Sequence, residues 1–474
     1  MGEKMNSKKI LKAGIGYIIG GVLIKGIAFI TTPIFTRLLT TDEFGVLNTY
    51  LSYEAIMAVI IGFQFAASLK SAKIEFENVT NGVAGYLKQL LILLITHTGL
   101  FFIFINVFFD YSVSLIGINS RLLINLLVVN SFCNALVNVY NAYISLYYEY
   151  KKYVAIGLIN ALGNVIISLA LIHTIMNNNR VSARIIGYVL PYILVSLYII
   201  YQILKNGRSE KGSFLSFSYR YCSPLLPYAC SDVMLGQFSK LYVEKKCGQS
   251  LMGIYSLSYN VYSIIGIIRI AMDYLVGPVY FEKRKINDQK GIQVLLQHYS
   301  RILGLASMGI MLLAPELIRI LGSSEFYEAR FSAIPLVAAS YYIFLISTVS
   351  QEEYYQGKTG VVSIVSVTAM IFNVIANIIV VPQYGVLGAS FCTMGTYFIM
   401  LISHLLVIRF GLKSDTFNYS VILLHSVGIL IFTVFALLIV DVTIVRFFGI
   451  FIVVALAVIE LCKAYKCLGL KFSA

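Results

Sequence analysis

Long uninterrupted apolar runs, separated by short polar connections, dominate the chain from about residue 13 onward. A helix that crosses a bilayer needs about 20 mainly apolar residues, whereas a membrane-spanning strand alternates in polarity over about 10 residues. Runs such as 90–109 and 421–440 are continuous and do not alternate. The pattern therefore predicts membrane-spanning helices and excludes a barrel of strands.

Pro, Gly and charged residues divide these runs into about fourteen predicted spans. They cover residues 13–38, 44–68, 84–109, 118–148, 153–176, 182–204, 219–244, 251–280, 292–314, 330–354, 360–381, 385–408, 418–440 and 444–465. The longest polar connection, at about 205–217, is too short to fold alone. The pattern predicts an all-α polytopic membrane protein without an extramembrane domain.

The composition agrees with this fold class. Apolar residues make up 59% of the 474 residues and charged residues only 12%, which is about half the share of a typical soluble domain and excludes a soluble enzyme. The seven Cys form no C-x-x-C pair, so neither a zinc site nor a disulfide framework is indicated. The sequence also holds no P-loop and no nucleophile elbow. We expect no catalytic residues, no metal and no cofactor.

Lys and Arg are unevenly shared between the two sides of the membrane. With the N-terminus inside, the inner connections receive more than twice as many of the 36 basic residues as the outer ones. Because cytoplasmic loops are enriched in Lys and Arg, both termini are predicted to lie in the cytoplasm. The net charge of +14 then reflects topology and does not indicate nucleic-acid binding.

Short motifs recur at an offset of about 207 residues, as expected for an internal repeat. The letters FGVL at 44–47 resemble MGIY at 252–255, and the tyrosine pair at 147–148 resembles the pair at 354–355. Each repeat holds six predicted spans, an even number, so both halves insert with the same orientation and are related by an axis along the membrane normal.

The repeat predicts three parts of the chain. Residues 1–211 form an N-terminal six-helix lobe, residues 212–413 form a C-terminal six-helix lobe, and residues 414–474 add helices 13 and 14 outside the repeat. Two parallel six-helix lobes around a central interface are an architecture of transporters.

Charges inside the predicted spans cost about 2.5–3.5 kcal/mol each on insertion scales, so each needs an explanation. Lys25 in the first span and Glu54 in the second lie at similar depth. They can form an ion pair, or Lys25 can face a lumen and meet an anionic substrate. Arg269 and Asp273, four residues apart in the eighth span, can pair along one helix face or line a cavity.

The seventh span carries two further charges, Asp232 and Lys240, about two turns apart on nearly the same face. The repeat offset relates Lys25 to about Asp232, so these positions belong to the helices that lead the two lobes, where a central cavity is expected. Four histidines have no acidic or Cys partner at a useful spacing, and we expect them to be satisfied in the interior or at the interface. They are His97, His173, His404 and His425.

Prolines mark the same two leading helices. Pro33 is expected to break the outer turn of the first span, and Pro224 and Pro227 to soften the inner half of the seventh. We interpret these three prolines as candidate hinges for bending during transport.

Small and aromatic residues have both packing and functional interpretations. Gly16, Gly20 and Gly21 favour close helix packing in the first span. The 34 Tyr residues can serve an aromatic belt at the membrane interface, or hydrogen-bond to sugar rings and stack on them in a lumen.

The segment TPIFTRLLTTDEFGVL at 32–47 resembles the N-terminal signature of polysaccharide repeat-unit flippases. These are the Wzx-type O-antigen and capsule transporters of the multidrug/oligosaccharidyl-lipid/polysaccharide exporter superfamily. The resemblance implies a MATE-like fold in the bacterial cytoplasmic membrane. It also implies that the protein moves undecaprenyl-diphosphate-linked oligosaccharides from the inner to the outer leaflet by alternating access, for lipopolysaccharide O-antigen, capsule or another surface polysaccharide.

The resemblance further implies a cationic lumen that suits the diphosphate and sugar headgroup. Lys25 and Arg37 match that role by position, followed by Lys240 and Arg269. Asp232 departs from a purely cationic lumen and leaves open a carboxylate that couples transport to protons or sodium.

The implied partners are the lipid-linked oligosaccharide, membrane lipids, and the polysaccharide polymerase with its chain-length machinery. The acidic residues Asp232, Glu54 and Asp273 keep open an alternative, a cation-coupled exporter of small molecules or drugs with the same fold.

Overall fold

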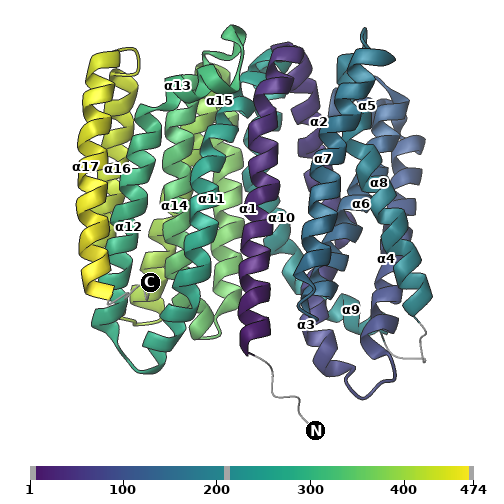
Figure 1. The fold of residues 1–474 in the computed structure, drawn as a ribbon, viewed down its shortest axis with the longest axis horizontal. Helices are drawn as coiled ribbons and strands as arrows, with labels where there is room; N and C mark the ends of the chain where they lie inside the picture. The colour runs from purple at the N-terminus through teal and green to yellow at the C-terminus, as the bar shows by residue number, and fades with distance from the viewer. Residues whose placement is uncertain (1–6, 208–213, 469–474) are drawn as a thin grey trace. The chain divides into compact units, whose positions relative to one another are not determined.

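The computed structural model describes the chain from residue 7 to 207 and from 214 to 468, with side chains described at 13–207, 214–269 and 276–464. Regular structure in these ranges is helical throughout. The chain divides into two compact units, residues 1–237 and 238–474, and the helices within each unit run nearly parallel (Figure 1).

In its described residues, 7–207 and 214–237, the first unit contains nine helices and the beginning of a tenth. They are α1 (Ser7–Leu38), α2 (Thr41–Gly62), α3 (Phe65–Glu75), α4 (Gly82–Val107), α5 (Phe109–Ile116), α6 (Arg121–Ser145), α7 (Tyr150–Thr174), α8 (Arg180–Asn206), α9 (Phe214–Cys222) and, after the 3-10 turn η1 (Ser223–Leu225), α10 (Leu226–Cys247).

The second unit begins within α10 and, as far as residue 468, where the description ends, continues with seven helices and two short turns. They are α11 (Gln249–Lys285), α12 (Gln289–Leu312), α13 (Ala314–Leu321), η2 (Ser324–Phe326), α14 (Ala329–Tyr355), α15 (Thr359–Leu406), the π-helical turn η3 (Val407–Gly411), α16 (Tyr419–Leu438) and α17 (Thr443–Leu468).

Eleven helical segments in the described part of the chain are long and apolar enough to cross a membrane. The number is twelve if α12 and α13, which meet at a bend of 63°, form one broken span. The predicted all-α polytopic membrane fold is therefore confirmed. The count is below the predicted fourteen partly because α15 counts once, although Gly385 breaks it with φ 56° and ψ −137° between the two spans predicted there. The remaining difference is α10, on which most of the predicted seventh span lies and which does not pass the same test.

The structure corrects two predicted spans of the first unit. The span predicted at 44–68 lies within one candidate span, Thr41–Glu75, but it is not one continuous helix. Phe63 and Gln64 adopt left-handed backbone angles, with φ of 44° and 56°, and separate α2 from α3. The helix predicted at 219–244 is divided by η1, which contains Pro224.

The predicted break at Pro33 is also wrong. Pro33 lies inside α1, which continues to Leu38. Proline removes one backbone donor from a helix, but the helix can continue when its neighbours keep their own bonds. Thr36 and Arg37 add side-chain hydrogen bonds to the carbonyls of Thr32 and Pro33, at 3.0 Å each, in this last turn.

Helix α1 packs against α7 through glycine. A Cβ atom built on Gly16 would lie 2.2 Å from the Tyr150 ring, and one on Gly20 would lie 2.4 Å from Cγ2 of Val154. A Cβ on Gly21 would meet nothing within 4 Å. The prediction of close packing is therefore confirmed for Gly16 and Gly20 and wrong for Gly21.

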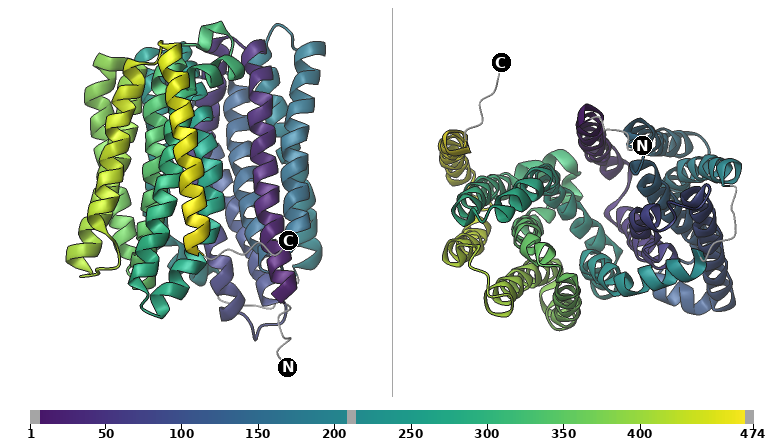
Figure 2. Two further views of the ribbon diagram at one scale, coloured as in Figure 1. Left: turned by 60° about the vertical axis from the view of Figure 1, so that its left-hand side comes forward. Right: turned by 90° about the horizontal axis from the view of Figure 1, so that it is seen from below.

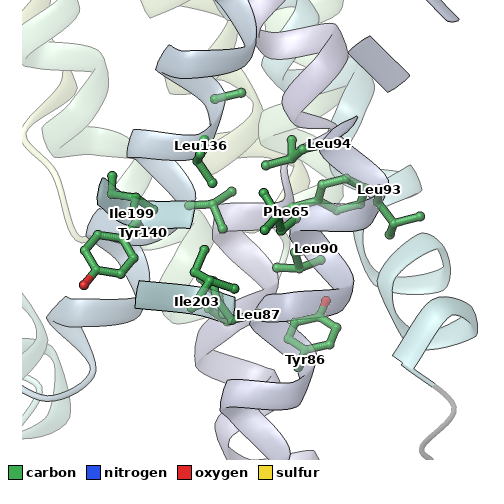
Figure 3. Packing of buried hydrophobic residues seen from close by; sticks show 14 of the residues in the cluster. Phe65, Tyr86, Leu87, Leu90, Leu93, Leu94, Leu136, Tyr140, Ile199 and Ile203 are labelled. Carbon is green, nitrogen blue, oxygen red and sulfur yellow. The ribbon is translucent and has the colours of Figure 1, made fainter. Parts of the chain in front are cut away.

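A continuous apolar core holds α2, α3, α4, α6, α8 and α9 together. Figure 3 shows Phe65, Leu90 and Leu94 packed toward Leu136 and Ile199 from facing helices. The core includes Ile61, Phe65 and Cys222, so the break between α2 and α3 and the end of α9 both lie next to it.

In the second unit α14 is the central helix, with nearly all of its side chains buried between α11, α12, α15 and α16. Helices α16 and α17 lie beside α12 (Figure 2). Arg446 fixes the start of α17 by two hydrogen bonds to the carboxylate of Glu316, at 2.6 and 2.8 Å. Glu460 fixes the other end of the helix by a 2.8 Å bond to Nδ1 of His298 on α12.

We expect Gly16→Ala and Gly20→Ala to lower the melting temperature of the purified protein in detergent, because each new methyl group must displace Tyr150 or Val154. Gly21→Ala is the matched control. It should leave the melting temperature unchanged or raise it, since alanine favours a helix over glycine by about 1 kcal/mol. Equal melting temperatures for all three variants would show that α1 does not depend on this contact.

Candidate functional site

Two of the predicted substrate-binding residues lie on α1. The side chains of Lys25 and Arg37 are both exposed, and Nη1 of Arg37 donates a 3.0 Å hydrogen bond to the carbonyl of Pro33. Since α1 packs mainly on α7, much of the helix surface is left uncovered. An exposed cation on an apolar helix can meet an anionic group of a ligand.

Glu54 on α2 is buried, with 3% of its surface exposed. Its Oε1 accepts a 2.7 Å hydrogen bond from Nδ2 of Asn134 on α6, and Oδ1 of Asn134 accepts one of 2.9 Å from Asn138. The ion pair that depth alone allowed between Glu54 and Lys25 is replaced by this amide contact. The three side chains form a continuous hydrogen-bonded chain.

This series of hydrogen bonds from Glu54 through Asn134 to Asn138 ends at a cavity. Asn134 and Asn138 line a space of about 480 Å³ together with residues of α2, α3 and α6, including Gln64 at the break between α2 and α3. A buried carboxylate is costly in an apolar surrounding unless hydrogen bonds or a bound cation offset its charge. Hydrogen bonds therefore connect the lining of this cavity to a buried carboxylate.

Lys240 on α10 lies in the second unit, with its Nζ 4.2 Å from the centroid of the Tyr259 ring on α11. A hydrogen-bonded polar cluster lies next to it, between α10, α11 and α15. Oγ1 of Thr393 lies 3.2 Å from Oγ of Ser239 and 3.3 Å from the hydroxyl of Tyr255. The ring and the hydroxyl groups provide a cation with both π and polar contacts in one place.

The other predicted site charges are Asp232, Arg269 and Asp273. Asp232 on α10 is exposed, and Arg269 on α11 is half-buried. The side chain of Asp273 lies outside the described residues, so the predicted Arg269–Asp273 pair is not described. In the described part of the chain, no three His, Cys, Asp or Glu side chains are arranged to hold a metal ion.

The prolines of the predicted seventh span lie at a joint between helices. Pro224 is in η1, and Pro227 is the second residue of α10. Cys222, the last residue of α9, donates a weak hydrogen bond of 3.6 Å from Sγ to the carbonyl of Gln64. The joint at the prolines therefore touches the break between α2 and α3.

His97 on α4 joins the same two places. Its Nδ1 lies 3.0 Å from the carbonyl of Ile61 at the end of α2, and its Nε2 lies 2.9 Å from the hydroxyl of Tyr219 on α9. Because a carbonyl can only accept, Nδ1 donates and Nε2 accepts from the tyrosine. The expectation that this histidine is satisfied is confirmed, and its partners show that it links the two breaks.

Sequence reasoning missed two buried polar contacts. Arg184 on α8 bonds Oγ of Ser168 at 2.8 Å and Oδ1 of Asn164, both on α7, and its guanidinium lies 3.7 Å from the centroid of the Phe35 ring on α1. It therefore ties three helices together.

The second missed contact joins the buried carboxylate of Glu353 on α14 to Nδ1 of His404 on α15, at 2.8 Å. The expectation that His404 has no acidic partner is therefore wrong. Isolated polar letters inside apolar runs were the only sequence signal for these contacts.

Comparisons with known proteins place this architecture. The model of the family described as "Polysaccharide biosynthesis protein" matches residues 10–272, more than half of the chain. The "Lsg locus putative protein 1" of Haemophilus influenzae is 21% identical over 420 residues, which cover 80% of this chain and 95% of that protein.

Solved structures share the fold at low identity. The lipid II flippase MurJ in an inward closed conformation aligns with a TM-score of 0.64 and 15% identity, over 97% of this chain and 99% of that one. An inward-facing MATE multidrug resistance transporter of the MOP superfamily aligns with a TM-score of 0.65 and 13% identity, over 82% of this chain and 96% of that one. The chain therefore shares the fold of these two transporters. The chain is a multi-pass membrane protein that belongs to the polysaccharide biosynthesis protein family.

Proposed function

We propose that this protein is a Wzx-type flippase, which moves undecaprenyl-diphosphate-linked oligosaccharide repeat units across the cytoplasmic membrane for O-antigen, capsule or another surface polysaccharide. The observation that carries the proposal is the match to the polysaccharide biosynthesis family over residues 10–272. The nearly complete overlap with the fold of a lipid II flippase supports a lipid-linked cargo.

The cations on α1 support the same cargo. A diphosphate headgroup carries about two negative charges, which cannot enter hydrocarbon without a large electrostatic cost. Exposed Lys25 and Arg37 lower that cost where they meet the headgroup, and Lys240 and Arg269 would act in the same way from α10 and α11. The lipid tail needs no such help and can stay in the bilayer.

In this proposal the lobes at 1–211 and 212–413 alternate between inward and outward access, with 414–474 as added helices and both termini in the cytoplasm. Pro224 and Pro227 supply the hinge of the second lobe, at the joint between α9 and α10. Once exported, the repeat unit would pass to the polysaccharide polymerase and its chain-length machinery.

A second candidate function is a cation-coupled exporter of small molecules. The hydrogen bonds that lead from the 480 Å³ cavity through Asn138 and Asn134 to Glu54 favour the exporter. A buried carboxylate reached in this way could couple transport to a proton or a cation. Coupling by Glu54 is compatible with the flippase as well. Deletion of the gene would separate the two functions, since altered drug susceptibility with intact surface glycans fits only the exporter.

We expect Lys25→Ala and Arg37→Ala to reduce surface polysaccharide at least about tenfold while the protein stays in the membrane at its normal level, because each removes a charge–phosphate contact. The measurement is immunoblotting of surface glycan and of the tagged protein in complemented deletion cells. Arg121→Ala, at an exposed arginine that begins α6, is the matched control and should export normally. Normal surface polysaccharide in the deletion strain would exclude the flippase.

We expect Glu54→Gln to abolish proton or sodium flux driven by an imposed gradient in proteoliposomes, because glutamine keeps the contact with Asn134 but carries no charge. The flux is measured with a trapped pH dye, or with ²²Na⁺ in the sodium arm. Glu75→Gln, at an exposed carboxylate that ends α3, is the control and should behave as wild type. Equal fluxes in wild type and Glu54→Gln would remove Glu54 from any coupling mechanism.

A further inference from the structure

A second cavity of the first unit lies where the ends of α4, α6 and α8 meet the start of α7. Its volume is about 280 Å³. Leu87 of α4, Tyr140 of α6 and Ile203 of α8 line it and are seen side by side in Figure 3. Small-molecule sites begin at about 300 Å³, so a cavity of this size fits one small ring with its substituents and not a whole oligosaccharide.

Three tyrosines form one wall. Tyr140, Tyr143 and Tyr147 are spaced by three and four residues, which brings them to one side of α6 and its following turn. The ring centroids of Tyr140 and Tyr143 are 6.2 Å apart, and those of Tyr143 and Tyr147 are 5.3 Å apart. Aromatic faces of this kind pack against the C–H face of a sugar ring, while phenolic hydroxyls can bond its hydroxyl groups.

The opposite wall offers hydrogen bonds. Gln202 and Asn206 on α8 line the cavity, and neither side-chain amide has a hydrogen bond to another residue in the described part of the chain. Each amide supplies two donors and an acceptor, which is the pattern needed for neighbouring hydroxyl groups. Tyrosines of an interfacial belt alone do not account for the partly buried Gln202 and the exposed Asn206 in the lining of the same cavity.

The charges of the cavity favour a neutral ligand. Only Glu149 and Lys152 among its lining residues are charged, and they pair with each other at 2.8 Å while remaining partly exposed. Because the two charges offset each other, the cavity has no excess cation to attract a diphosphate. It therefore differs in chemistry from the lysine and arginine of α1.

We infer that this cavity is a sugar-ring subsite, in which a hexose-type ring stacks on Tyr143 and is hydrogen-bonded by Gln202 and Asn206. The inference rests on the proposed function for the origin of the sugar, which is the headgroup of the lipid-linked oligosaccharide. With the proposed topology this end of the unit faces the cytoplasm, where the headgroup begins its passage. The subsite would hold one sugar of the headgroup at the start of its passage, before the diphosphate reaches Arg37 at the outer end of α1.

The absence of Trp from the sequence allows a direct test on the full-length protein. Tyr143→Trp places a single fluorescent indole in the cavity, and Tyr111→Trp, at a 63% exposed position on α5, is the matched control. The probes are the lipid-linked oligosaccharide fraction extracted from the host cells, the water-soluble oligosaccharide released from it by mild acid, and the residual polyprenyl phosphate.

We expect a saturable change of the Tyr143→Trp emission with the intact fraction and none with the residual lipid, while the Tyr111→Trp emission does not change. A response to the released oligosaccharide alone would also support a sugar subsite but would assign it to a soluble sugar. Adding Gln202→Ala should weaken the apparent affinity about tenfold, because its hydrogen bonds are lost. Gln293→Ala, at a half-buried glutamine of α12, is the control for that change and should leave it unaltered.

The inference is overturned if no probe changes the Tyr143→Trp emission of helical, monodisperse protein, or if the residual lipid gives the same change as the intact fraction. This failure is distinct from failure of the proposed function. If deletion abolishes surface polysaccharide but the Tyr143→Trp emission does not change, only the sugar-ring subsite is rejected. If deletion leaves surface polysaccharide intact, the flippase falls, and a response to the released oligosaccharide would still establish the cavity as a sugar site.

Discussion

Buried charged and backbone polar groups need partners in this structure, because hydrocarbon supplies no water to replace one. This need accounts for the side chains that bond backbone carbonyls at the break between α2 and α3. At the end of α2 the carbonyl of Ile61 is met by His97, and that of Gln64 by Cys222. It also explains why the buried carboxylates Glu54 and Glu353 each lie against a side-chain nitrogen.

The same need separates two kinds of polar residue. Arg184, Arg446 and Glu460 make hydrogen bonds to neighbouring helices and stabilise the packing within their own unit. The amides of Gln202 and Asn206, by contrast, face a cavity with their bonding capacity unused by the described protein. A ligand can bond the amides that line the cavity, but it cannot easily replace the bonds between helices. The cavities are therefore better candidates for ligand binding than the buried ion pairs.

Apolar periodicity was enough to predict the helices but not their partners. The boundary between the spans at 360–381 and 385–408 was predictable because Pro382 and Gly385 mark it locally. The break at Phe63 and Gln64 was not, because these residue types rarely adopt left-handed angles and are held there by distant contacts. The partner of His404 was hidden in the same way, since it lies 51 residues away in the sequence. Lys25 is exposed, and its contact with a substrate stays a prediction.

The bridge formed by His97 has a mechanical consequence for the first unit. Its imidazole is hydrogen-bonded to the last turn of α2 through Nδ1 and to Tyr219 of α9 through Nε2. In the proposed hinge motion at Pro224 and Pro227, the break before α3 would have to move with α9, because His97 is hydrogen-bonded to both the end of α2 and Tyr219. A state in which only one of these two joints has moved would first require a hydrogen bond of His97 to break.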